Sequence, residues 1–241
     1  MDAPTIRTLG YDGLLITFGE RLSDTSNRAA LAFHETLVEA QLSGAVETST
    51  SLVSVYLRFD PNHVSHANMR QTLSEMLASR DWCSAPPPEG RSLWRIPAAF
   101  GGDLGPQLAE ASAMAGITEA AAVAALTRHP VRVQTIGFAP GMPYLGELPA
   151  NWDLPRQTKL TAQVPRGGLC VAIRQLVLFP NPTPTGWRHI AQTRVNLFRP
   201  ANDMPFLLKP GDEVKFEPVS PDELNAYEDD PMGGAICEAL S

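Results

Sequence analysis

The residues best suited to chemistry gather around one irregular stretch, residues 137–149, which holds three glycines, three prolines and two aromatic side chains. Glycine adopts φ values that other residues avoid and proline fixes its own φ, so this mixture predicts a loop with one specific path. Phe138 and Tyr144 are expected to anchor it. Loops of this kind often line functional sites. The alternative is a proline-rich surface crossing with two buried aromatic anchors.

His129 lies shortly before this stretch, at the end of a predicted helix and ahead of Pro130. A helix C-terminus favours a protonated imidazole, so His129 is a candidate general acid or anion ligand. The alternative role is structural, with the ring capping the last helical carbonyls.

Neutral hydrogen-bonding groups follow along the chain. Tyr144, Gln175 and Thr193 can each hold a carbonyl or amide group. Arg166 offers a planar fork for a carboxylate or phosphate. Each of these side chains has an ordinary alternative, because a strand Gln or Thr commonly faces solvent and a turn Arg is commonly solvated.

The usual self-contained catalytic signatures are absent: there is no Gly-x-x-x-x-Gly-Lys-Ser/Thr, no His-Glu-x-x-His and no Gly-x-Ser-x-Gly. Cys83, Cys170 and Cys237 form an odd, widely spaced set. This spacing predicts reduced thiols, with neither a disulfide framework nor a metal site, and Cys170 lies in an apolar run typical of a buried, inert thiol.

Composition and net charge limit the kinds of partner that the chain is expected to bind. The 241-residue chain is 44% hydrophobic and 19% charged, with a net charge of -7 and no basic cluster. Nucleic acid and anionic membrane surfaces are therefore not expected as main partners. No signal-peptide pattern or long apolar run is visible, so we expect a cytoplasmic protein without a membrane segment.

The first part of the chain predicts a small α+β domain over residues 1–85. Hydrophobic patterns indicate one strand at 6–18 and one at 51–59, with helices over 27–40 and 65–79. This order suits helices on one face of an antiparallel sheet. The stiff segment Pro86–Gly90, residues 86–90, is expected to be the linker.

Residues 91–219 predict a second domain. After a strand at 94–100 and two short helices, the pattern changes to many short strands divided by turns, which favours a barrel or sandwich. These strands are expected at 131–136, 169–173, 176–179, 195–198 and 213–216. Residues 220–241 form an acidic segment that we expect to be a partly ordered tail without chemistry.

The segment Gly137–Gly146 resembles the Gly-Phe-x-Pro-Gly-Phe-x-Tyr-Leu-Gly signature of the KipI family, also called PxpB (the B component of 5-oxoprolinase) or allophanate hydrolase subunit 1, a carboxyltransferase domain with subdomains C and D. The resemblance covers nearly the whole chain. Further matching segments are Ile96–Pro97, Phe100–Pro106, Val164-Pro165-x-Gly167, Phe179–Pro180, Thr183-Pro184-x-Gly186-Trp187 and Leu208–Pro218.

The resemblance implies an α+β fold: a small N-terminal domain of ferredoxin-like type, followed by a cyclophilin-like β-barrel domain. It also implies two partners, a KipA-like subunit (PxpC) and a LamB/YcsF-like subunit (PxpA). Together these form an ATP-dependent 5-oxoprolinase that opens 5-oxoproline to glutamate. ATP is used by the complex and is not necessarily bound by this chain.

The resemblance also implies the site. His129 and Tyr144 are the expected catalytic residues; the expected substrate-binding residues are Gly137, Phe138, Pro140, Gly141, Pro165, Arg166, Gln175, Trp187 and Thr193. The chain departs from the family pattern at Cys170 and Ile173, where glycines are usual, and at Gln192, where arginine is usual. These changes predict less space and less positive charge around a ligand.

Two functions follow as hypotheses. The first is a subunit of a multi-subunit, ATP-dependent amide-processing hydrolase, of the 5-oxoprolinase or of the allophanate hydrolase/urea carboxylase kind. In it, His129, Tyr144 and loop N–H groups polarise a carbonyl and donate a proton. The second is a KipI-like regulatory module, for example a histidine kinase inhibitor, without catalysis of its own. A barrel that binds an unrelated small molecule is a third possibility.

Overall fold

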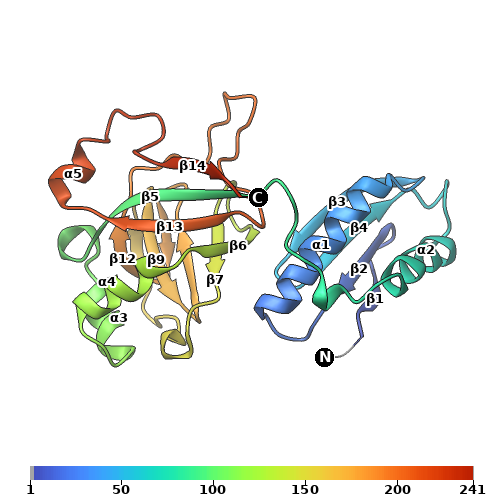
Figure 1. Cartoon of the computed structure of the whole chain (residues 1–241), viewed down its shortest axis with the longest axis horizontal. Helices are drawn as coiled ribbons and strands as arrows, with labels where there is room; N and C mark the ends of the chain where they lie inside the picture. Colours follow the sequence, from blue (N-terminus) through green and yellow to red (C-terminus); the bar gives the residue numbers. More distant parts are fainter. Residues whose placement is uncertain (1–2, 241) are drawn as a thin grey trace. The chain divides into compact units, whose positions relative to one another are not determined.

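The computed structural model describes residues 3–240, which divide into two compact units at Glu89 and Gly90 (Figure 1). The division falls within the proline-rich segment expected to be a linker. Within these residues no single helix is long and apolar enough to cross a membrane; only a sharply bent pair, Leu108–Met114 with Glu119–Arg128, meets that test on length and composition.

The first unit is an antiparallel four-stranded sheet in the order β1-β2-β4-β3, with two helices. Its elements are β1 (Thr5–Leu9), β2 (Gly13–Thr17), α1 (Asp24–Ala40), β3 (Ala45–Ser51), β4 (Ser54–Phe59), α2 (His66–Ala78) and η1 (Trp82–Ser84). The order β-β-α-β-β-α differs from the β-α-β-β-α-β of a ferredoxin-like domain, so that expectation is not confirmed.

The core of this unit follows from the amphipathic pattern of α1. The helix begins with a reciprocal capping box between Ser23 and Ser26. Its buried Phe33 packs edge-on against Trp82, with ring centroids 4.9 Å apart, and also contacts Phe18. The predicted single strand at 6–18 is in fact the β1–β2 hairpin.

The second unit contains the expected β-barrel. Its elements are β5 (Ser92–Phe100), η2 (Gly102–Leu104), α3 (Leu108–Met114), α4 (Glu119–Arg128), β6 (Val131–Ile136), β7 (Pro143–Gly146), η3 (Ala150–Trp152), β8 (Thr161–Val164), β9 (Gly168–Ala172), β10 (Gln175–Leu178), β11 (Thr183–Thr185), β12 (Arg188–Gln192), β13 (Glu213–Pro218), α5 (Pro221–Asn225) and β14 (Ile236–Ala239). Seven strands run β12-β9-β10-β7-β6-β13-β5, and pairing of β12 with β5 closes the barrel. Only β13 and β5, among the described pairs, run parallel.

Two predicted segments differ from the structure. Residues 220–241, expected as a tail, supply α5 and β14, and β14 pairs with the first half of β5. The expected strand at 195–198 is reduced to one bridge between Phe198 and Phe206. Whether these two segments form strands depends on contacts with parts of the chain distant in sequence, because a strand forms only where a neighbouring strand has an unpaired edge.

Strand alternation gives the barrel wall two apolar faces. Leu169, Leu176 and Ile190 belong to the main core, where Leu126 of α4 also packs. The alternate residues of these strands form a second buried cluster on the outer face of the wall. That outer cluster contains Met142, Val164, Cys170, Ala172, Val177, Phe179 and Trp187.

Candidate functional site

An aromatic cavity of about 270 Å³ lies against this outer cluster. It is lined by Phe138, Met142, Tyr144, Arg156, Gln157, Leu160, Val177, Phe179, Pro184, Thr185, Gly186 and Trp187. Strands β7 and β10 supply the floor, and the segment before β12 supplies one wall. The loop at 137–142 and the segment 155–160 complete the rim.

The loop of residues 137–142 is closed by its own backbone, as its composition predicted. The Gly137 N–H donates to the Met142 carbonyl at 3.1 Å, and the Met142 N–H donates to the Ala139 carbonyl at 3.1 Å. Gly141 has φ +75°, and a Cβ there would lie 3.1 Å from the Leu197 carbonyl oxygen, so a side chain is strained at this position. The two N–H groups are thus used inside the loop and do not polarise a ligand.

Three aromatic residues give the cavity its character. The rings of Tyr144 and Trp187 meet edge-on, with centroids 6.0 Å apart. Phe138 has φ +68° and is 80% exposed at the rim. Burial raises the pKa of Tyr144, although nearby Arg156 opposes this, so the Tyr144 hydroxyl stays protonated near neutral pH and can donate a hydrogen bond.

Arg156 is the cation of the aromatic cavity. Its guanidinium carbon lies 5.5 Å from the centroid of the Trp187 ring, within the range of a cation–π contact. Both neighbouring residues are tied to the barrel: the Pro155 carbonyl accepts from Arg188 Nη1 at 2.7 Å, and the Gln157 N–H donates to the Gly186 carbonyl at 2.7 Å. The backbone that presents Arg156 is therefore fixed.

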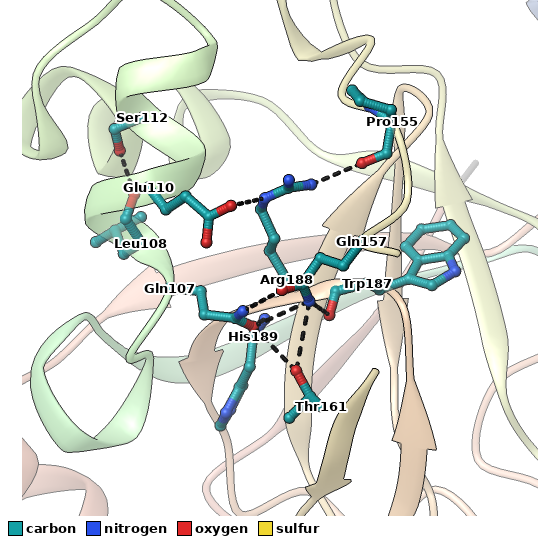
Figure 2. Close-up of polar contacts among 10 residues, drawn as sticks. All are labelled: Gln107, Leu108, Glu110, Ser112, Pro155, Gln157, Thr161, Trp187, Arg188 and His189. Carbon is teal, nitrogen blue, oxygen red and sulfur yellow. Dashed lines mark hydrogen bonds and ion pairs between the residues drawn. The ribbon is translucent and has the colours of Figure 1, made fainter. Parts of the chain in front are cut away.

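A chain of amides holds this segment against β12 (Figure 2). The His189 N–H donates to Gln107 Oε1 at 2.8 Å, and Gln107 Nε2 donates to Gln157 Oε1 at 2.6 Å. Gln157 Nε2 in turn donates to the Trp187 carbonyl at 3.1 Å. The carboxamide of Gln107 both accepts and donates, which an ionised carboxylate cannot do.

A second, cationic cavity of about 320 Å³ shares Arg156 and Gln157 with the aromatic cavity. Its other lining residues are Glu110, Thr158, Lys159 and Arg188. Arg188, whose side chain is 6% exposed, is neutralised by Glu110 through an Nε to Oε1 contact of 2.9 Å (Figure 2). The positive charge left facing the ligand space is that of Arg156 and Lys159.

The structure brings three predicted site residues together in the aromatic cavity: Phe138, Tyr144 and Trp187. Gly137, Pro140 and Gly141 shape the adjoining loop without lining the cavity. His129 is exposed at the end of α4 and does not line the aromatic cavity.

The remaining predicted binding residues do not line the aromatic cavity. Pro165 and Arg166 are exposed on the turn before β9. Gln175 Nε2 donates to Gln134 Oε1 at 2.8 Å, and Thr193 Oγ1 donates to the Gly167 carbonyl at 3.0 Å; both side chains are buried. Their contacts are structural.

The three departures from the family pattern do not narrow the aromatic cavity, because none of them lines it. Cys170 is buried in the outer cluster, as predicted, and burial raises the pKa of its thiol. Ile173 lies at the β9–β10 turn, 42% exposed. Gln192 is buried and donates to the Arg166 carbonyl at 2.6 Å.

One further group on the barrel wall bears on chemistry. The His189 ring is buried, with Nε2 unpaired within residues 3–240, and burial lowers the pKa of this imidazole. Among the same residues, no three His, Cys, Asp or Glu side chains gather to hold a metal ion.

Sequence reasoning missed Arg156 and Gln157, which connect the two cavities. They lie in an irregular polar segment with no hydrophobic period and no motif, so the sequence alone carried no signal for them. Phe179 and Pro184 belong to matched family segments, which pointed to this region without assigning a role.

Comparison with known proteins places the chain in a family. It is 28% identical to the 5-oxoprolinase B component of Bacillus subtilis over 237 residues, covering 93% of this chain and 97% of that protein. It is 40% identical to the 5-oxoprolinase B component of Escherichia coli O157:H7 over 131 residues, which is 54% of this chain and 60% of that protein.

Solved structures with the same fold were also found. TTHA0988 superposes with a TM-score of 0.72 at 30% identity; the match covers 90% of this chain but only 40% of TTHA0988. Kluyveromyces lactis urea carboxylase shares the fold, with a TM-score of 0.71 at 18% identity, over 98% of this chain and 24% of that one. The family model for the carboxyltransferase domain, subdomain C and D, matches residues 4–208, and the chain belongs to this family.

Proposed function

We propose that the chain is one subunit of a multi-subunit, ATP-dependent enzyme that processes a small amide, of the 5-oxoprolinase kind. The observation that carries the proposal is the aromatic cavity, which offers hydrogen-bonding groups and a cation but an incomplete catalytic set. The similarity to the 5-oxoprolinase B component along 97% of the Bacillus subtilis protein supports the same assignment.

The proposed chemistry rests on what the cavity residues can donate. The protonated Tyr144 hydroxyl is a suitable donor to an amide carbonyl, and polarising that carbonyl lowers the barrier to attack. The lining contains no cysteine, lysine, histidine or acidic residue to serve as nucleophile or general base. Those groups, and the ATP site, are assigned to partners, a KipA-like subunit (PxpC) and a LamB/YcsF-like subunit (PxpA).

The test is reconstitution. The chain is co-purified with the KipA-like and LamB/YcsF-like proteins of the same source, and ATP-dependent release of glutamate from 5-oxoproline is measured. Turnover that disappears when this chain is omitted supports the proposal. A stable complex without turnover on 5-oxoproline refutes that substrate. We propose that His129 acts as a general acid where a partner subunit covers the end of α4, so in the active complex His129→Ala is expected to remove turnover while leaving the chain folded.

A regulatory role is the second candidate, and one observation favours it. Phe138 and Leu160 are 80% and 60% exposed in the lining of the aromatic cavity, and exposed apolar groups at a rim mark protein contacts. If no complex forms with the proposed subunits, and the chain instead inhibits a histidine kinase in a manner abolished by Phe138→Ser, this second candidate replaces the first.

A further inference from the structure

The two cavities that share Arg156 differ in the polarity and charge of their linings, and this difference indicates which kind of ligand they would bind. The aromatic cavity is lined mainly by carbon, with Trp187 and Tyr144 at its wall and floor. The cationic cavity carries three basic side chains against one carboxylate. This local positive charge stands out in a chain whose net charge is -7.

Arg156 is the group available to an incoming anion. Within the described part of the chain, no carboxylate forms an ion pair with Arg156 or with Lys159, whereas Arg188 is engaged by Glu110. The Arg156 guanidinium lies over the Trp187 ring, which leaves its N–H edges free to form a bidentate contact with a carboxylate.

We infer that Arg156, which lines both cavities, is the residue by which this chain recognises the carboxylate of a small amide substrate. The planar amide lies in the aromatic cavity, within reach of the Tyr144 hydroxyl, and the carboxylate binds the Arg156 guanidinium with Lys159 nearby. This inference deepens the proposed function and rests on it, because it assigns the recognition of charge in the substrate to this chain and to one residue.

The inference is tested on the isolated full-length chain by calorimetric titration with three probes. These are 5-oxoproline, its neutral counterpart 2-pyrrolidinone, which has the same lactam ring without the carboxylate, and acetate, which has the carboxylate without the ring. We expect 5-oxoproline to bind more tightly than either of the others. Its affinity should fall with added salt while that of 2-pyrrolidinone should not.

Arg156→Gln is the decisive variant. Because Arg156 is exposed, we expect roughly a tenfold loss of affinity for 5-oxoproline, which corresponds to about 1.4 kcal/mol. Affinity for 2-pyrrolidinone should not change. The matched control is Arg7→Gln, which removes an exposed arginine of the first unit that lines neither cavity and should change neither affinity.

Three results overturn the inference: equal binding of 5-oxoproline and 2-pyrrolidinone, no effect of Arg156→Gln, or an equal loss with both lactams, which indicates damage to the cavity. Failure of the proposed function would give a different binding result from failure of this inference. If carboxylates bind in an Arg156-dependent way but the lactam ring adds nothing, the anion site stands and the 5-oxoproline assignment falls.

Discussion

Replacing Gln107 by alanine tests the amide chain that holds Arg156 in place. The change removes the acceptor of the His189 N–H and the donor to Gln157. A buried donor left unpaired costs about 1–3 kcal/mol, and the lost bond to Gln157 adds about 1 kcal/mol. Because Gln107 is half-exposed, water reaches part of the vacated space, and we expect a net loss of about 2 kcal/mol.

For a unit of this size, such a loss lowers the melting temperature of the barrel by about 4–8 °C. Differential scanning calorimetry measures it, and hydrogen exchange should show faster exchange in residues 155–161, where the backbone loses its tie to β12. The matched control is Gln163→Ala, on an exposed glutamine of β8, with an expected change within about 0.5 kcal/mol. Equal melting temperatures for the two variants would refute the structural role of Gln107.

Three further predictions concern the barrel unit. Ile173 has φ +43° in a two-residue turn of the type that favours Asn, so Ile173→Asn should raise the free energy of unfolding by roughly 1 kcal/mol in urea titration; a loss of stability contradicts this. Burial lowers the pKa of His189 in the folded state, so stability should fall as pH drops below the ordinary histidine range, near 6.5, because the unfolded chain binds the proton more readily. His189→Gln should flatten that fall, with His34 in the other unit giving a similar background, and an unchanged slope is the contrary result. Gly141→Val should lower the melting temperature by several degrees and weaken binding of any ligand of the aromatic cavity, since the Leu197 carbonyl is in the way; a wild-type melting curve argues against it.

The sequence predicted the parts of the site that depend on local chain geometry. Phe138 and Tyr144 were found because glycine and proline around them dictate a loop. Arg156 was not found, since its position is set by Arg188, which is 32 residues further along the chain, a contact that no local pattern encodes.

The same distinction between local chain geometry and contacts distant in sequence applies to the fold. The barrel was predicted from alternating short runs, but two strands were missed. Most residues of β3 are exposed and polar, and all four residues of β14 are exposed, in a segment whose acidic composition predicted a tail. Such strands form where a neighbour presents an open edge. In the first unit, Gly10 and Gly13 sit on either side of the hairpin turn that the single predicted strand overlooked.

Strand β5 constrains the order in which the strands of the barrel can pair during folding. It is the first strand of its unit, yet its partners β12, β13 and β14 all follow much later; 88 residues separate Phe100 from Arg188, where the nearest of them begins. Contacts between residues so distant in sequence form slowly, because a long loop must close first. During synthesis, β5 therefore emerges with both edges unpaired and waits for most of the unit, a period in which chaperones can bind it and in which it is exposed to aggregation.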